Sequence, residues 1–123
     1  MVTIEEMEAM LDEIAMELPQ EFYKELNGGI LLLPEAKFHE QSQQGDLYIM
    51  GEYYRGGNMG RYIAIYYGSF AGVYGHLAPE HLKEQLRSTL KHEFRHHLES
   101  LGGERDLEKI DEKNISNYLN KNS

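Results

Sequence analysis

Apolar residues near the start of the chain recur at alternating steps of three and four, which predicts an amphipathic helix. The stripe runs from residue 4 to residue 18 and consists of Ile4, Met7, Leu11, Ile14 and Leu18. Thr3 and Glu6 have the spacing of a capping box at the start of this helix. Pro19 interrupts the pattern, and a short second helical piece is expected to end at Asn27-Gly28-Gly29.

The middle of the chain changes to the pattern of short strands. Residues 30–33 are apolar and predict a buried strand, and residues 34–45 are polar without a period and predict a loop. Residues 46–55 and 61–67 are rich in Tyr and Ile and are joined by a five-residue glycine-rich link, which predicts a hairpin. Residues 68–77 are expected to be a connection.

The strongest helical pattern begins at Pro79, a residue favoured in the first turn of a helix. Its apolar side predicts a helix over about 79–101, ended by Gly102-Gly103, and it consists of Leu82, Leu86, Leu90, Phe94, His97, Leu98 and Leu101. A last amphipathic helix is expected over 107–119. The order helix, strand, hairpin, long helix, short helix predicts one α+β domain over 1–123, with helices packed on a small, mainly antiparallel sheet.

Composition and charge narrow the possible functions. The chain has no cysteine, which excludes disulfides, thiolate zinc sites and cysteine nucleophiles. Acidic residues outnumber basic ones 21 to 12, and because nucleic-acid binding usually leaves a basic footprint, no nucleic-acid partner is expected. The acidic N-terminal segment lacks the features of a secretory signal, and no apolar run is long enough to span a membrane. A cytoplasmic location without a membrane partner is therefore expected.

The long helix contains a motif with specific chemistry, His92-Glu93-Phe94-Arg95-His96. Residues four apart on a helix rise about 6 Å and turn about 40°, so His92 and His96 project side by side. Each imidazole can then place a nitrogen about 2.0–2.1 Å from a shared Zn²⁺. Glu93 lies beside this face and is the candidate general base, which takes a proton from a metal-activated water.

Alternatives remain for these residues and for the third ligand, which a catalytic zinc site usually has. His92 and His96 also suit a solvated helix end, where histidine interacts well with the helix dipole. Among downstream carboxylates Asp106 is the first choice and Glu104 the second, whereas Glu99 is about 10 Å along the same rigid helix from His92. Asp106 is equally well placed to cap the last helix.

Other candidate residues are expected to have structural roles. His97 points toward the apolar side of its helix and is expected to be packed and hydrogen-bonded. The tyrosines of the predicted hairpin are expected to pack in the sheet and core: Tyr48, Tyr53, Tyr54, Tyr62, Tyr66 and Tyr67. Zinc proteases often hold substrate along an exposed strand edge, and this hairpin is a candidate for that edge.

Three segments carry a resemblance to a known family. Residues 89–98 contain a His-Glu-x-x-His-His helix, residues 50–56 resemble a Gly-x-Tyr-x-Gly segment, and residues 64–68 resemble an Ile-x-Leu-Tyr strand. Together they resemble a family of small bacterial zincin-like proteins regarded as zinc metallopeptidases, over about residues 1–107. The resemblance implies a minimal zincin fold, a zinc site at His92 and His96, and peptidase activity.

The chain departs from this family pattern after the second histidine. The family has Gly three residues and Asp six residues after that position, whereas here position 99 is Glu and Gly103-Glu104-Arg105-Asp106 comes four residues later. Four residues are about one helical turn, so a longer helix moves the turn away from the metal. This departure counts against Asp106 as the third ligand.

Two functional hypotheses follow. The first is a zinc-dependent metallopeptidase that hydrolyses peptide bonds in peptide or protein substrates, with His92, His96 and Asp106 as metal ligands and Glu93 as general base. The second is a non-catalytic metal-binding or protein-interaction domain that retains the zincin helix.

Overall fold

The computed structural model describes residues 1–42 and 47–103. Within these residues the elements follow one another as α1 (Ile4–Glu17), the 3₁₀ helix η1 (Gln20–Tyr23), β1 (Gly29–Leu33), β2 (Lys37–Phe38), β3 (Tyr48–Ile49), β4 (Gly51–Tyr54), β5 (Tyr62–Tyr66), α2 (Tyr67–Tyr74) and α3 (Pro79–Gly103). Helices and a small sheet pack together, so the predicted α+β fold class is confirmed.

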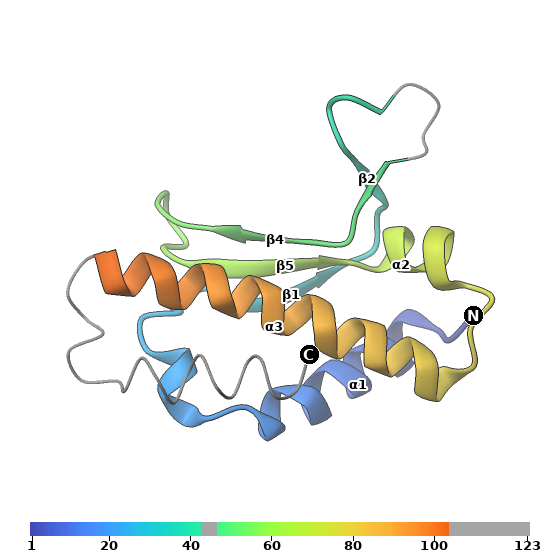
Figure 1. Ribbon diagram of the computed structural model, residues 1–123, viewed down its shortest axis with the longest axis horizontal. Coiled ribbons are helices and arrows are strands. Elements are labelled where there is room, and N and C mark those ends of the chain that lie inside the picture. Colours follow the sequence, from blue (N-terminus) through green and yellow to red (C-terminus); the bar gives the residue numbers. More distant parts are fainter. Residues whose placement is uncertain (43–46, 104–123) are drawn as a thin grey trace.

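The main sheet has three strands in the order β1-β5-β4. β5 pairs in parallel with β1 and antiparallel with β4, so the main sheet is mixed. The parallel pair arises because β4 runs back along the sheet, which returns the chain to the end from which β1 started. β2 and β3 form a separate antiparallel ribbon that extends away from the main sheet (Figure 1).

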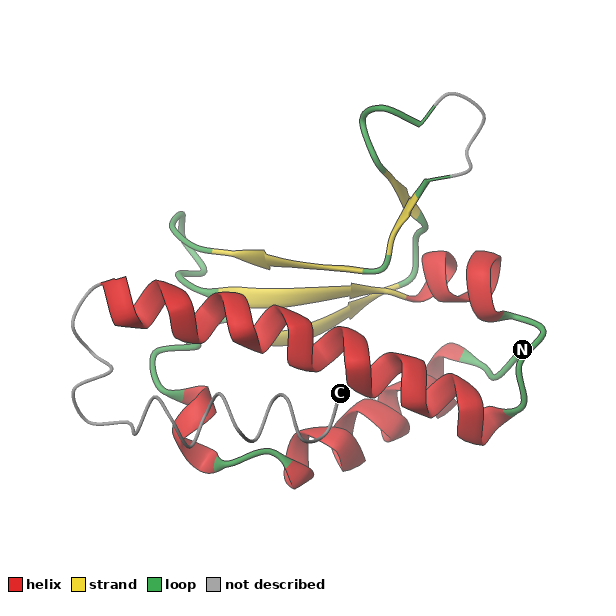
Figure 2. Cartoon of the chain, in the orientation of Figure 1, coloured by secondary structure: helices red, strands yellow, loops and turns green. Residues whose placement is uncertain are grey.

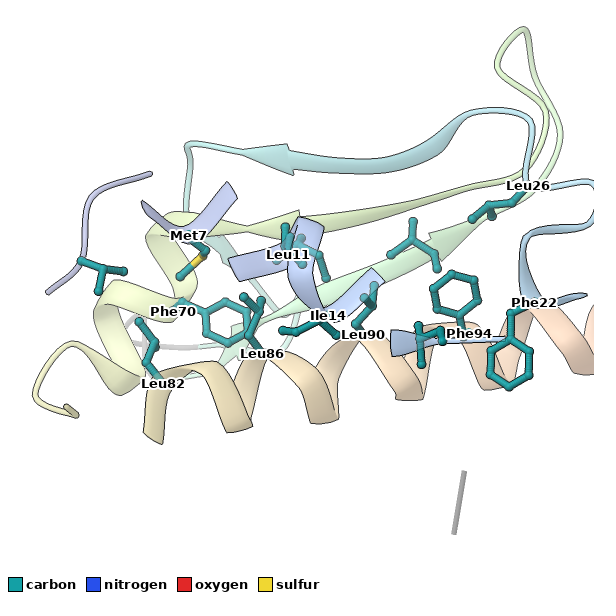
Figure 3. Close-up of a cluster of buried hydrophobic side chains, with 14 of the residues drawn as sticks. Met7, Leu11, Ile14, Phe22, Leu26, Phe70, Leu82, Leu86, Leu90 and Phe94 are labelled. Atoms are coloured by element: carbon teal, nitrogen blue, oxygen red, sulfur yellow. The ribbon is translucent and has the colours of Figure 1, made fainter. Parts of the chain in front are cut away.

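Helices α1 and α3 lie on the same face of the main sheet, which gives a two-layer arrangement (Figure 2). Successive side chains of a strand point to opposite faces of the sheet. Ile63 and Ile65 of β5 point toward these helices and are fully buried. Facing them are apolar side chains of α1 and α3, and Phe22 and Phe94 pack with their ring centroids 5.9 Å apart (Figure 3). The core therefore lies between the sheet and the two helices and fixes the position of α3.

Several elements agree with their sequence patterns. Thr3 caps α1 as expected, because its Oγ1 accepts from the Glu6 backbone N–H at 3.1 Å while the Glu6 carboxylate accepts from the Thr3 N–H at 3.0 Å. β4 and β5 form the predicted hairpin, with Tyr54 opposite Tyr62. α3 begins at Pro79 as predicted and ends at Gly103, two residues beyond the expected end.

Two segments were predicted wrongly. Residue 67 was expected to end a strand and residues 68–77 to form a connection, but residues 67–74 form helix α2. Phe70 of this helix is buried in the core, and its packing outweighs the low helix propensity of the two glycines in the segment. Lys37 and Phe38, expected in a loop, form β2, since their backbone pairs with β3. The last helix expected over 107–119 lies outside the described residues.

No helix among residues 1–42 and 47–103 combines the length and the apolar character needed to cross a membrane.

Candidate functional site

Helix α3 positions the candidate site through its buried stripe. Leu82, Leu86, Leu90 and Phe94 are fully buried at steps of four, and Leu98 and Leu101 continue the stripe. This stripe fixes the rotation of the helix about its axis. His92 and His96 therefore lie on the exposed side of α3, while Glu93 lies at the border with the core.

The two histidines of the motif are brought together at their Nε2 atoms. These atoms lie 3.2 Å apart, and the rings meet edge-on with centroids 4.7 Å apart. Two zinc–nitrogen bonds of about 2.05 Å at a tetrahedral angle place their nitrogens about 3.3 Å apart. The observed separation therefore fits two imidazoles that bind one tetrahedral zinc ion.

The electrostatic surroundings favour the neutral form of His92, which is the form that binds metals. Partial burial, together with the charges of His96 and Arg95, holds the pKa of His92 below its ordinary value. His92 can therefore offer a nitrogen lone pair near neutral pH.

Glu93 has an unusual environment for a glutamate. Its exposed fraction is only 6%, and no side chain in the described part of the chain donates a hydrogen bond to its carboxylate. Burial, with a smaller contribution from the negative charge of Glu52, raises the pKa of Glu93 to about 7. A carboxylate with a pKa near the working pH is suited to accept and return a proton.

Glu52 on β4 is a second carboxylate near this site, and the sequence analysis did not identify it. Its Oε1 atom accepts hydrogen bonds from Lys37 Nζ, Tyr54 OH and, at 2.8 Å, Tyr66 OH. Burial alone raises the pKa of Glu52, but these three donors outweigh it, so the pKa lies below its ordinary value. Glu52 therefore remains ionised near neutral pH. The sequence feature that could have identified Glu52 is a single charged residue within a tyrosine-rich strand.

His97 has a structural role, as expected. It is fully buried, its Nε2–H donates to the Lys24 carbonyl at 2.8 Å, and its Nδ1 accepts from Tyr53 OH at 2.9 Å. Burial is the main cause that lowers the pKa of His97 below its ordinary value. The neutral ring thereby ties α3 to β4 and to the segment after η1.

Within the described residues, no third ligand lies beside the two histidines. Among residues 1–42 and 47–103 no group of three His, Cys, Asp or Glu side chains is arranged to hold a metal ion. Glu99 is exposed on α3, seven residues beyond His92. Asp106, the first choice from the sequence, and Glu104, the second, both lie outside the described residues. Of the ligand set predicted as His92, His96 and Asp106, only the two histidines lie within the described residues, and the structure brings these two together.

The fold and the histidine pair define a class of protein: a small α+β domain with a candidate metal centre on its longest helix. No family model matches the chain, and no curated protein matches it. A solved structure of a conserved hypothetical protein from Thermus thermophilus is 33% identical, with a TM-score of 0.73, over 83% of this chain and 99% of that chain. The chain belongs to the same family as this protein, whose name assigns no activity.

Proposed function

We propose that the protein is a zinc-dependent metallopeptidase that cleaves peptides in the cytoplasm, and that it is a member of the zincin-like family its motifs resemble. The observation that carries the proposal is the pair of Nε2 atoms 3.2 Å apart, on the same helix as the buried Glu93. The separation matches two ligands of one zinc ion, and Glu93 is next to the first of them in the chain.

The described side chains divide the chemical work between them. A bound zinc ion would supply Lewis acidity for a water molecule and for the carbonyl of the substrate. His92 and His96 hold the ion through neutral Nε2 atoms. Glu93 accepts the proton of the attacking water and then delivers it to the leaving amine. Burial raises the pKa of Glu93 to about 7, and the positive charge of a bound zinc ion would lower it again, which favours the carboxylate form that accepts the proton.

Strand β4 is the proposed support for the substrate. It is an edge strand of the main sheet, and it lies against α3, where Tyr53 of β4 contacts His97 of α3. An extended peptide paired with the free edge of β4 would use backbone hydrogen bonds for affinity. This placement brings a peptide bond near the motif without a second domain.

A non-catalytic metal-binding domain is the second candidate function. The observation that favours it is the missing third ligand within the described residues, since two histidines alone bind zinc more weakly than a catalytic ligand set. Both candidates require His92 and His96 to hold a metal. Only the first requires Glu93 for turnover.

The proposal is tested by metal content and peptide hydrolysis measured on the same purified samples. We expect about one zinc per chain in the wild type and in Glu93→Gln, and none in His92→Ala or His96→Ala. The matched control is His81→Ala, which removes another exposed histidine of α3. Hydrolysis of a peptide library, followed by mass spectrometry, should occur in the wild type and the control only. Zinc binding without hydrolysis in the wild type would support the second function.

A further inference from the structure

The outer edge of β1 is a second free edge of the main sheet. β1 pairs with β5 on one side, and no strand within the described residues pairs with its other side. Every residue of β1 is half-buried, whereas four of the five residues of the central strand β5 are buried. Natural edge strands are usually protected by a charge, a proline or a bulge. β1 consists of one glycine, one isoleucine and three leucines, and has no such protection.

A groove runs along this edge between β1 and α1. Its volume is about 380 Å³, and its apolar lining includes Leu11 of α1 and residues 30–33 of β1. Three carboxylates of α1 also line it, from Glu5, Glu8 and Asp12, and all three residues are exposed. The groove therefore combines unpaired backbone groups, an apolar lining and an acidic wall.

The charge on this wall has no basic partner within the described residues. Residues three and four apart lie on one side of a helix, so Glu5, Glu8 and Asp12 form a row. In the part of the chain that the structure describes, no basic side chain pairs with any of them. The acids on the opposite side of α1, Glu13 and Glu17, instead pair with basic side chains of α3.

We propose that this groove binds an extended, basic segment of a partner protein, which adds a strand to β1. Backbone hydrogen bonds with β1 give the affinity, and lysine or arginine at alternate positions faces Glu5, Glu8 and Asp12 and gives the specificity. A second copy of this chain does not fit, because it would bring two acidic rows together in a protein of net charge −9. The site lies at the opposite edge of the sheet from β4 and does not depend on the metal.

The test is binding of a labelled peptide in which lysine alternates with valine. We expect the peptide to shift the backbone amide signals of residues 30–33 in NMR spectra of the full chain. In the triple variant Glu5→Gln, Glu8→Gln, Asp12→Asn, fluorescence anisotropy should show binding about fivefold to tenfold weaker at low salt. A matched variant, Glu21→Gln, Glu40→Gln, Glu80→Gln, changes the net charge equally at exposed positions that do not line the groove and should bind as the wild type does.

Two control peptides separate the backbone from the charge. A peptide with glutamate in place of lysine should not bind, and N-methylation of alternate amides should abolish binding if strand addition is correct. Equal weakening in the two triple variants, or amide shifts in β4 in place of β1, would overturn the proposal. A dimer in sedimentation velocity whose contacts map to residues 30–33 would also overturn it, since it would assign the groove to a second copy.

Discussion

At the scale of single residues, the two carboxylates near the motif have opposite environments. Glu93 is buried without a hydrogen-bond donor from the described residues, and its pKa is raised to about 7 by burial and by the charge of Glu52. Glu52 is buried to a smaller extent, and the donors around it lower its pKa. Pairs of acids whose environments separate their pKa values are typical of acid–base sites. On the proposed function, Glu93 would be the group that exchanges a proton, and Glu52 would provide a fixed negative charge.

Replacement of Glu93 by Gln tests its role in the proposed hydrolysis. The amide has nearly the same shape but cannot accept the proton of water, so we expect kcat to fall by about 10²- to 10⁴-fold while zinc content stays unchanged. Glu80→Gln, which neutralises an exposed acid of the same helix, is the control and should keep full activity. A Glu93→Gln enzyme with normal kcat would remove Glu93 from the mechanism.

Replacement of Tyr53 by Phe tests the hydrogen bond that holds His97. Without the hydroxyl, the buried Nδ1 of His97 loses its donor. We expect the free energy of unfolding to fall by about 1–2 kcal/mol in chemical denaturation. Tyr74→Phe removes a hydroxyl for which no hydrogen bond is found among the described residues and should have little effect. Similar losses in both variants would contradict a specific role for the Tyr53–His97 contact.

At the scale of secondary structure elements, two sets of contacts hold the ribbon β2–β3 against the rest of the fold. Lys37 of β2 contacts Glu52 of β4, which also accepts from Tyr66 of β5. The first turn of α2 approaches the segment just before β2 so closely that a Cβ atom on Gly68 would lie 2.4 Å from the Ala36 backbone nitrogen. Both contacts join segments that are distant in the sequence.

The Gly68 approach predicts a strong effect of one methyl group. Gly68→Ala places that methyl against backbone, which cannot move aside, so we expect a loss of about 1–3 kcal/mol in the free energy of unfolding. Gly72→Ala is the contrast, because the nearest atoms to its Cβ belong to the end of the Tyr48 side chain, which can shift at a lower cost than backbone, and alanine favours the helix by about 1 kcal/mol. Equal thermal stability of the Gly68→Ala variant and the wild type would show that the approach is not tight.

The Glu52 cluster predicts a pH dependence of stability. The folded-state pKa of Glu52 is lowered, so the cluster stabilises the fold above the ordinary glutamate pKa of about 4.3 and loses this contribution as the pH falls below it. We expect Glu52→Gln to be less stable than the wild type at about pH 6 and the difference to shrink by about pH 3. Chemical denaturation at both pH values measures it. A constant difference would mean that the charge of Glu52 does not stabilise the fold.

Sequence patterns predicted an element correctly where a single hydrophobic periodicity ran through the segment. They failed where contacts between residues distant in the sequence determine the structure. The stripes of α1 and α3 and the hairpin β4–β5 follow from spacing alone, and the pairing of His92 with His96 follows from one helical turn. Helix α2 depends on the burial of Phe70, and the parallel pairing of β1 depends on the path of the whole chain. The lowered pKa of Glu52 depends on hydrogen-bond donors from three strands, and no spacing within one segment predicts that they come together.

At the scale of the whole molecule, the sheet has two free edges within the described residues, and they differ in chemistry. β4 lies against α3, the helix that carries the candidate metal centre, whereas β1 lies beside the acidic row of α1. Natural proteins seldom leave such edges bare without a use. If both proposals hold, the β4 edge binds the substrate, the β1 edge binds a partner segment, and one small domain carries two strand-pairing sites.

The proposed activity depends on one metal ion held by two histidines of α3. Anomalous diffraction at the zinc absorption edge, from crystals of the metal-replete protein, locates this ion directly. We predict one strong peak about 2.0–2.1 Å from the Nε2 atoms of both His92 and His96, with Glu93 beside it. Crystals that contain zinc but show no peak between these two nitrogens would contradict the account.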